Sequence, residues 1–204
     1  LTVAGVQTCA LPICVIWIDA HADLHSPYTT PSGNMHGMPI ACSLGEDNMD
    51  KVQNKPDDET MEYWERLKTI GNIVPKINYS DLVYIALRDF EPAEDHLIKK
   101  NKVRVFTVPE IRKKAVERIA IESLNYLDHC DYIYVSFDVD SMDSRISAGT
   151  GTPVPNGLTE KEAGNLVYYL MRSKKIACFE MVEIDRKSTR LNSSHSQQSR
   201  MPSS

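Results

Sequence analysis

The sequence has few of the features that define membrane, nucleic-acid-binding or disulfide-rich proteins. Its longest apolar run, Ala10–Ile18, spans nine residues, whereas a membrane-spanning helix needs about 20. Acidic residues outnumber basic ones by 28 to 23, and the net charge of −5 disfavours a phosphate backbone as the partner. The five cysteines have no regular spacing and no CxxC pair, and no basic start precedes a small-residue cleavage site. We therefore expect a soluble, cytoplasmic protein without a disulfide framework, membrane contact or nucleic-acid partner.

What the sequence does contain is typical of a globular domain. Hydrophobic residues make up 42% and charged residues 25% of the chain, which are ordinary values. Short apolar runs alternate with helical patterns. We expect strands at 14–19, 81–87, 103–106, 132–138 and 176–184, and helices at 61–70, 91–100, 109–126 and 159–173. This alternation predicts one α/β domain with a mainly parallel sheet.

The first motif of chemical interest follows the first expected strand. Asp19, His21 and Asp23 stand two residues apart, and a period of two points alternate side chains the same way. Carboxylate and imidazole ligands together suit Mn, Fe or Zn better than Ca. A solvated acidic turn is the alternative interpretation.

A second motif, Ser136–Asp140, places Asp138 and Asp140 at another strand end. Paired carboxylates without a cation repel each other, and burial would raise one pKa strongly. Capping or loop acids are the alternative. Taken together, the two motifs supply four carboxylates and one imidazole, which is enough to bridge two cations.

Three further segments carry polar or flexible residues near these motifs. The loop 29–37 holds a glycine-flanked His36, and a histidine in such a loop suits proton transfer. Two glycines in 149–153 allow the backbone to approach a ligand closely. Glu180 and Glu183 end the last expected strand and can hold a guanidinium through two oxygens. Each of these segments, taken alone, also fits a surface turn.

In this order, DAHAD, SGNMHG, SFDVD, GTGTP and FEMVEI resemble the arginase branch of the ureohydrolases. The resemblance implies a three-layer α/β/α fold, two Mn²⁺ ions per subunit and a homotrimer or homohexamer. It also implies hydrolysis of a small-molecule substrate, L-arginine, to L-ornithine and urea.

The same resemblance assigns roles to individual residues. The implied metal ligands are Asp19, His21, Asp23, Asp138 and Asp140. The implied catalytic residues are His36 as proton shuttle, Asp23 and Glu183. The implied substrate-binding residues are Ser32, Asn34, Glu91, Thr152, Glu183 and His25.

The sequence departs from the family pattern at several positions. His25 stands where the family has Asn, Glu91 where it has Asp, and Arg186 where it has Pro. A further histidine ligand, which the family takes from an earlier Gly-Gly-Asp-His segment, is absent. Agmatinase or another ureohydrolase is therefore the alternative function, and a non-catalytic fragment the alternative for this chain. A deacetylase of related fold fits less well, because that class carries a single zinc.

Both ends of the chain differ from its middle. GVQTCALPI near the start and DRKSTRLNSSH near the end resemble in-frame translations of sequencing-adapter DNA. We accordingly expect foreign segments at 1–13 and 186–204. Between them, at 14–185, we expect a partial ureohydrolase domain, truncated at both ends and inactive as it stands.

Overall fold

A computed structural model describes residues 13–184 of the chain, and a five-stranded parallel sheet forms its centre. The strands lie in the order β3-β2-β1-β4-β5. Their bounds are β1, Ile13–Ile18; β2, Leu82–Ile85; β3, Arg104–Phe106; β4, Tyr132–Asp138; and β5, Ile176–Val182. Each expected strand is present, and the prediction of a parallel α/β fold is confirmed.

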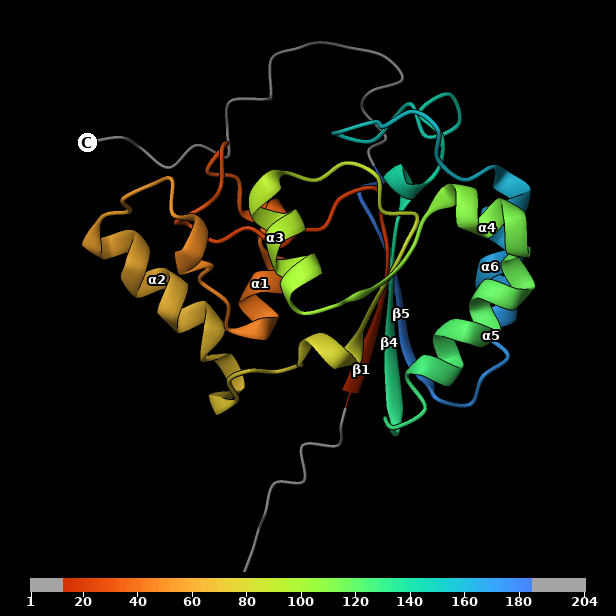
Figure 1. The fold of residues 1–204 in the computed structure, drawn as a ribbon, viewed down its shortest axis with the longest axis horizontal. Helices are drawn as coiled ribbons and strands as arrows, with labels where there is room; N and C mark the ends of the chain where they lie inside the picture. Colours follow the sequence, from red (N-terminus) through yellow and green to blue (C-terminus); the bar gives the residue numbers. More distant parts are fainter. Residues whose placement is uncertain (1–12, 185–204) are drawn as a thin grey trace, which may run out of the picture.

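Helices cover both faces of the sheet. Figure 1 shows α1 (Pro39–Leu44), α2 (Asp58–Lys68) and α3 (Pro92–Lys100) on one side, and α4 (Val108–Lys114), α5 (Val116–Tyr126) and α6 (Glu160–Leu170) on the other. The architecture is therefore three-layered, α/β/α. Within residues 13–184, no helix is both long and apolar enough to span a bilayer.

The central strand β1 supplies both halves of the core. Cys14, Ile16 and Ile18 pack into the cluster under α4, α5 and α6, whereas Val15 and Trp17 pack into the cluster on the opposite face. Successive side chains of a strand point to opposite faces, so a continuous apolar run is what a sheet covered on both sides requires. The continuous apolar run of β1 is therefore consistent with its place in the middle of the sheet.

Local capping signals set where several helices begin. Thr159 accepts a hydrogen bond from the backbone N–H of Glu162, whose side chain accepts one from Thr159, so the predicted capping box is confirmed. Asp57 caps α2 in the same way by accepting from Thr60. Glu91 and Glu94 form the corresponding box before α3.

One helix prediction was incomplete. The single helix expected at 109–126 is broken at Ala115, which lies between α4 and α5 with φ 71° and ψ 147°. The expected loop 29–37 contains the 3₁₀ turn Met35–Gly37, and α1 begins two residues after it. Hydrophobic periodicity continues across the break at Ala115, since both helices pack on the same core, and so gives no sign of it.

The break at Ala115 leads to a stability prediction. A positive φ with extended ψ is strained for alanine but accessible to glycine. Ala115→Gly is expected to stabilise the fold by about 1 kcal/mol, which corresponds to a rise in Tm of roughly 2–4 °C. Differential scanning calorimetry measures it. Ala163→Gly, inside α6, is the control and should lower Tm; a lower Tm for Ala115→Gly as well would contradict the strained geometry.

The cysteines correct another expectation. Cys14 of β1 and Cys130, two residues before β4, form a disulfide, contrary to the prediction of no disulfide framework. The two residues are 116 positions apart, so no sequence spacing reveals the pair. They meet because β1 and β4 are neighbouring strands in register, with Cys14 opposite Ile133.

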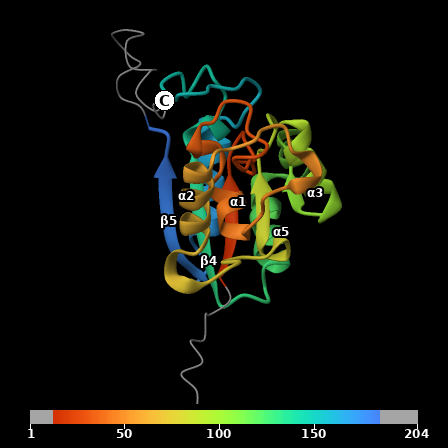
Figure 2. The ribbon, with the colours of Figure 1, turned by 90° about the vertical axis from the view of Figure 1, so that its left-hand side faces the viewer.

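The order of the strands determines where a ligand can bind. From β1 the chain builds outward through β2 and β3, then returns to place β4 on the other side of β1. A crevice forms at such a switch point, beyond the carboxyl ends of the two strands. Figure 2 shows β5 running toward the edge that carries the long loops. At this edge Asp19 directly follows β1 and Asp138 is the last residue of β4.

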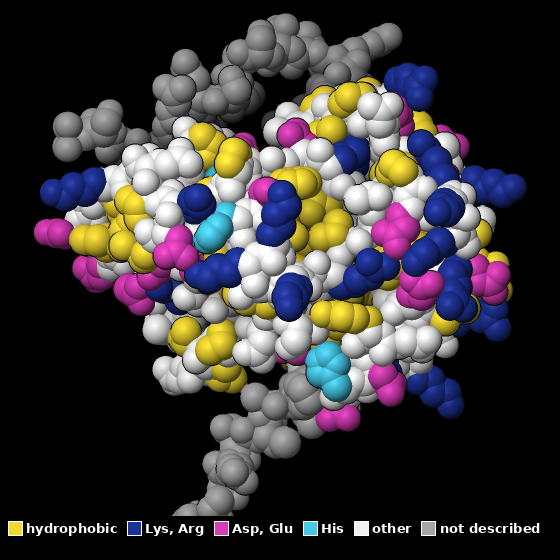
Figure 3. All heavy atoms as spheres, in the orientation of Figure 1, with side chains coloured by type: hydrophobic (Ala, Val, Ile, Leu, Met, Phe, Trp, Pro, Cys, Tyr) yellow, Lys and Arg dark blue, Asp and Glu magenta, His cyan; other side chains and the backbone are white. Residues whose placement is uncertain are grey.

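Charges of both signs are mixed on the surface. On the face shown in Figure 3, basic side chains over α4 and α5 alternate with acidic ones. Ion pairs such as Arg104–Glu110 at 2.8 Å and Arg118–Glu122 at 2.8 Å account for part of this pattern. Exposed pairs of this kind contribute little to stability.

Candidate metal centre and substrate loops

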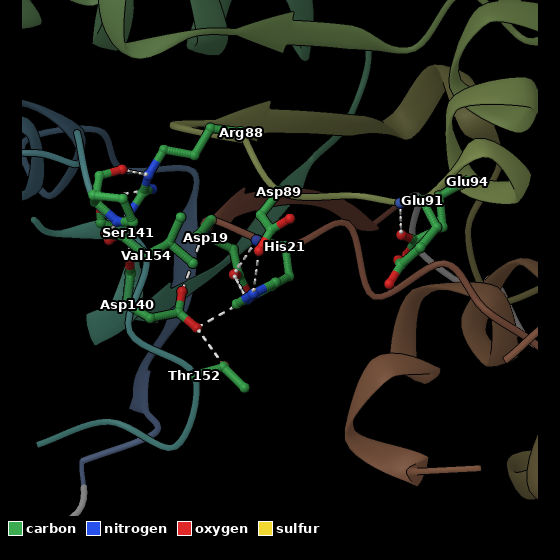
Figure 4. A network of polar contacts seen from close by, with 12 residues as sticks. Asp19, His21, Arg88, Asp89, Glu91, Glu94, Asp140, Ser141, Thr152 and Val154 are labelled. Atoms are coloured by element: carbon green, nitrogen blue, oxygen red, sulfur yellow. Dashed lines mark hydrogen bonds and ion pairs between the residues drawn. The ribbon is translucent and has the colours of Figure 1, made fainter. Parts of the chain in front are cut away.

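Three predicted metal ligands converge at the switch point. One ligand atom each from Asp19, His21 and Asp140 lies within 4.8 Å of the others. His21 Nδ1 lies 2.9 Å from Asp140 Oδ2 and 3.5 Å from Asp19 Oδ1 (Figure 4). Asp19 and Asp140 are both 1% exposed. The sheet therefore holds two buried carboxylates from neighbouring strand ends around one imidazole.

The convergence arises from turns and not from strand alternation, which corrects the reasoning from a period of two. β1 ends at Ile18, and the chain bends so that the His21 N–H donates to Asp19 Oδ1 at 2.7 Å. Asp140 lies in the 3₁₀ turn Val139–Ser141, where its N–H donates to Asp138 Oδ1 at 2.7 Å. Asp23 has a left-handed backbone with φ 51°. Asp23 and Asp138 thus border the central three residues.

The pKa values in this cluster show that its negative charges outnumber its positive ones. Burial, followed by the charges of Asp19 and Asp140, raises the pKa of Asp138 to about 9. Burial, with the charge of Asp19 next in size, raises the pKa of Asp23 to about 9. Burial opposes protonation of His21, but hydrogen bonds to Asp140 and Asp19 outweigh it and raise its pKa to about 11. Four acids share one imidazole, so the cluster favours the binding of cations.

The donor set fits divalent transition metals. Carboxylate oxygen with imidazole nitrogen suits Mn, Fe or Zn, and the other nearby cation, Arg88, directs its guanidinium at backbone carbonyls. Among residues 13–184, the residues that would hold metal are Asp19, His21, Asp23, Asp138 and Asp140. Their assignment as ligands remains a prediction.

The loop predicted to bind substrate is anchored to this site through its backbone. The N–H of His25 donates to the carbonyl of Gly37 at 3.0 Å, and the N–H of Ile40 donates to that of Asp23 at 3.0 Å. Ser32 and His36 are exposed and Asn34 is partly so. The loop therefore presents its polar groups to solvent, and its predicted role in binding substrate remains a prediction.

Glu183 and Thr152 approach the site from the other side. The Glu183 carboxylate lies against Gly151, whose Cβ, if present, would be 3.5 Å from Oε2. Thr152 Oγ1 donates to Asp140 Oδ2 at 3.3 Å. Glu183 also has a left-handed backbone, with φ 56°.

His25 and Glu91, predicted as substrate contacts, bind each other. His25 Nε2 lies 2.9 Å from Glu91 Oε2, and its Nδ1 lies 3.1 Å from the Thr29 hydroxyl. Glu94 closes the group, with Oε2 3.5 Å from His25 Nε2. Burial, together with its contact to Glu91, raises the pKa of Glu94 to about 8. This second cluster lies on the far side of His21 from Asp140 (Figure 4).

Arg88 lies beside the carboxylate cluster, and the motifs did not single it out. Its five N–H groups lie within hydrogen-bond distance of six backbone carbonyls, those of Ala86, Asp140, Ser141, Met142, Val154 and Pro155. It thereby joins the end of β2 to both limbs of the loop that carries Asp140 and Thr152. The sequence signal for Arg88 is its position three residues before Glu91, which the resemblance assigns to substrate binding.

Comparison with known proteins agrees with this geometry. The model of the arginase family matches residues 2–195. Arginase from Brevibacillus brevis is 35% identical over 90% of this chain and 57% of its own length. Arginase-1 from Bos taurus is 32% identical over 85% of this chain and 50% of its own.

Solved structures give the same result. A 1.7 Å crystal structure of Bacillus subtilis arginase superposes with a TM-score of 0.74 at 33% identity, covering 86% of this chain and 55% of that one. An Entamoeba histolytica arginase in complex with L-ornithine has a TM-score of 0.74 at 28% identity, covering 86% and 54%. Formimidoylglutamase from Bacillus subtilis has a TM-score of 0.65 at 25% identity, covering 85% and 46%.

The fold and the strand ends define a three-layered α/β protein with a cluster of carboxylates at one edge of its parallel sheet. The matches identify its family. The chain belongs to the arginase family, which confirms the resemblance seen in its motifs. It spans about half the length of the curated relatives that it matches. The proposed foreign ends at 1–13 and 186–204 fall almost wholly outside the described residues and remain a prediction.

Proposed function

We propose that the protein to which this chain belongs is a manganese-dependent amidinohydrolase that converts L-arginine to L-ornithine and urea. The observation that supports this most strongly is the set of four buried or bordering carboxylates and one imidazole at the switch point of the sheet. The Entamoeba histolytica relative binds L-ornithine, the product that this reaction would give.

Each set of residues has a distinct part in this proposal. When bound, divalent ions lower the pKa of a coordinated water toward neutrality and so supply a nucleophile. Asp19, His21, Asp23, Asp138 and Asp140 would hold two such ions, and Mn²⁺ suits their oxygen-rich donor set.

The substrate would lie between the two loops that border the carboxylates. Glu183 would hold the guanidinium through its carboxylate, with Thr152 beside it. Ser32 and Asn34 would bind the α-carboxylate. His36 would pass a proton to the leaving amine, a task suited to an exposed imidazole. We further expect a homotrimer or homohexamer.

A second candidate is another ureohydrolase, because His25 stands where the family carries asparagine. The imidazole is bound on both nitrogens, to Thr29 and to Glu91, so it offers no free donor to an α-carboxylate. It also occupies one oxygen of the acid expected to meet the α-amino group. The structural match to formimidoylglutamase also supports a substrate other than L-arginine.

The two candidates differ in the groups that their substrates present. If Ser32 and Asn34 bind the α-carboxylate, the intact protein should favour L-arginine over agmatine by roughly 100-fold or more in kcat/KM, because an analogue without that group leaves polar atoms unpaired. Urea release from each substrate, with manganese present, measures it. Ser32→Ala with Asn34→Ala should narrow the ratio, whereas Ser80→Ala, distant from the loop, should not. Equal kcat/KM values in the unaltered protein would favour the second candidate.

A further inference from the structure

A second group of metal-ligating side chains lies at the opposite end of the same strands. Cys14 is near the start of β1, Cys130 and His129 precede β4, and Asp81 immediately precedes β2. Cys14 and Asp19 are five residues apart along an extended strand, about 17 Å at 3.3 Å per residue. The group is therefore separate from the carboxylate cluster and independent of the proposed function.

The four side chains present their ligand atoms to one point. One atom from each of Cys14, Cys130, His129 and Asp81 lies within 4.8 Å of all the others. His129 Nε2 lies 3.0 Å from Asp81 Oδ1 and 3.6 Å from Cys14 Sγ. A tetrahedral zinc with bonds of 2.0–2.3 Å would set its ligands roughly 3.3–3.8 Å apart. The two distances from His129 lie close to that range, and the two sulfurs, joined in the disulfide, need to separate.

The group is buried on the side of its two cysteines and open to solvent on the side of His129. Cys14 and Cys130 are 0% and 1% exposed, whereas the His129 side chain is 48% exposed. Asp81 uses its other oxygen, Oδ2, to accept from the Asn78 N–H and side-chain amide. Those contacts orient the carboxylate so that Oδ1 is directed at His129, as outer partners do for metal ligands. Oδ1 also accepts from the Ser80 hydroxyl at 3.0 Å.

We propose that this group binds one zinc ion once the Cys14–Cys130 disulfide is reduced, with Cys14, Cys130, His129 and Asp81 as ligands. Two thiolates, an imidazole and a carboxylate are the donors that zinc accepts in four-coordinate sites. Thiolates favour zinc over the manganese proposed for the other site. Ion binding would hold β1, β2 and β4 together at the edge where the disulfide links only β1 and β4.

The reaction balances with a phosphine reductant. Its phosphorus is oxidised to the phosphine oxide with the oxygen of one water molecule. The S–S bond breaks, and the two sulfurs take up the two hydrogens of that water as thiols. Zinc binding then forms two Zn–S bonds and releases the two thiol protons.

Cobalt provides a readout specific to this site. The full 204-residue chain is reduced with a phosphine, freed of metal with a chelator, and titrated with Co²⁺ under argon. A thiolate ligand gives a near-ultraviolet sulfur-to-cobalt charge-transfer band, which ions bound by the carboxylate cluster lack. We expect one equivalent of Co²⁺ to develop the band, one equivalent of Zn²⁺ to abolish it, and the oxidised chain to give none.

The chain offers matched controls. A triple variant, Cys9→Ser, Cys42→Ser and Cys178→Ser, retains only the two cysteines of the group and should keep the band. His129→Asn, at a half-exposed position, should weaken cobalt binding at least roughly tenfold, since even an outer partner of a ligand is worth 10–100-fold. Cys130→Ser should abolish the band, with circular dichroism to report folding.

Two results would overturn the proposal. The first is the absence of a charge-transfer band in the reduced triple variant, which would leave the pair as a disulfide alone. The second is a band whose cobalt affinity His129→Asn does not change. Neither result depends on Cys130→Ser folding, and neither bears on urea release.

Discussion

Saturating Mn²⁺ is expected to raise the Tm of the chain by roughly 5–10 °C. A ligand at 100 times its Kd stabilises the folded state by about 2.7 kcal/mol, and each kcal/mol shifts Tm by about 2–4 °C in a domain of this size. The physical source is the cluster at the switch point, where acids with raised pKa values share one imidazole. Thermal unfolding with manganese and with a chelator measures the shift.

In the same experiment, Asp138→Asn distinguishes the effect of metal binding on Tm from the stability of the metal-free chain. Burial and neighbouring acids raise the pKa of Asp138 from 3.8 to about 9. A raised carboxyl pKa destabilises the folded state wherever the unfolded chain is ionised, above about pH 4. The neutral amide removes that cost and can still accept from the Asp140 N–H. In chelator at pH 7 the variant should therefore have a higher Tm than the unaltered chain, and the difference should shrink as the pH falls toward 4.

In manganese the order should reverse, because Asp138→Asn removes a ligand. Dialysis and elemental analysis should find at least one Mn²⁺ fewer per chain. Asp131→Asn, the same substitution at an exposed position beside β4, is the control and should retain the manganese shift. A variant that binds manganese as well as the unaltered chain would contradict the assignment of Asp138.

The sequence predicted the sheet well because its strands are buried on both faces. Runs such as Leu82–Ile85 are fully buried, so they appear as uninterrupted apolar segments. It predicted that the acids Asp19 and Asp140 would meet for a related reason: residues that follow such runs lie at one edge of a parallel sheet. The motifs around Asp19 and Asp140 needed no knowledge of the turns that bring them together.

Features that depend on pairing between distant segments could not be predicted in the same way. The disulfide between Cys14 and Cys130 depends on β1 and β4 being neighbours. The bond from His25 to Glu91 depends on how α3 starts beside the loop. The break at Ala115 depends on two short helices packing on one core. Local sequence patterns carry no information about such partners, whereas the strand order supplies it directly.

Arg88 is the clearest example of a residue whose partners lie in distant segments of the chain. Among the residues outside the core, we expect its replacement to lower the free energy of unfolding the most. Arg88→Met keeps the length of the side chain but removes the guanidinium from six carbonyls. The Ser141 and Val154 carbonyls still accept from the N–H groups of Leu158 and Ser144, whereas the other four lose the donor that Arg88 supplies. Hydrogen bonds to charged groups contribute about 1.5–3 kcal/mol each, and their effects are not additive. We expect a loss of about 3 kcal/mol or more in the free energy of unfolding, or a fall in Tm of roughly 6–12 °C.

The same substitution should also weaken manganese binding, because Arg88 Nη2 donates to the Asp140 carbonyl at 2.7 Å and so fixes the turn that directs its carboxylate at His21. Arg88→Lys, which keeps the charge but lacks the forked donors, should recover only part of both losses. Arg66→Met, at an exposed position on α2, is the matched control. Chemical unfolding gives the stability, and the manganese-induced rise in Tm reports the site. If Arg88→Met lowered stability but kept the full manganese response, Arg88 would be a structural clamp for the loop without a part in positioning Asp140.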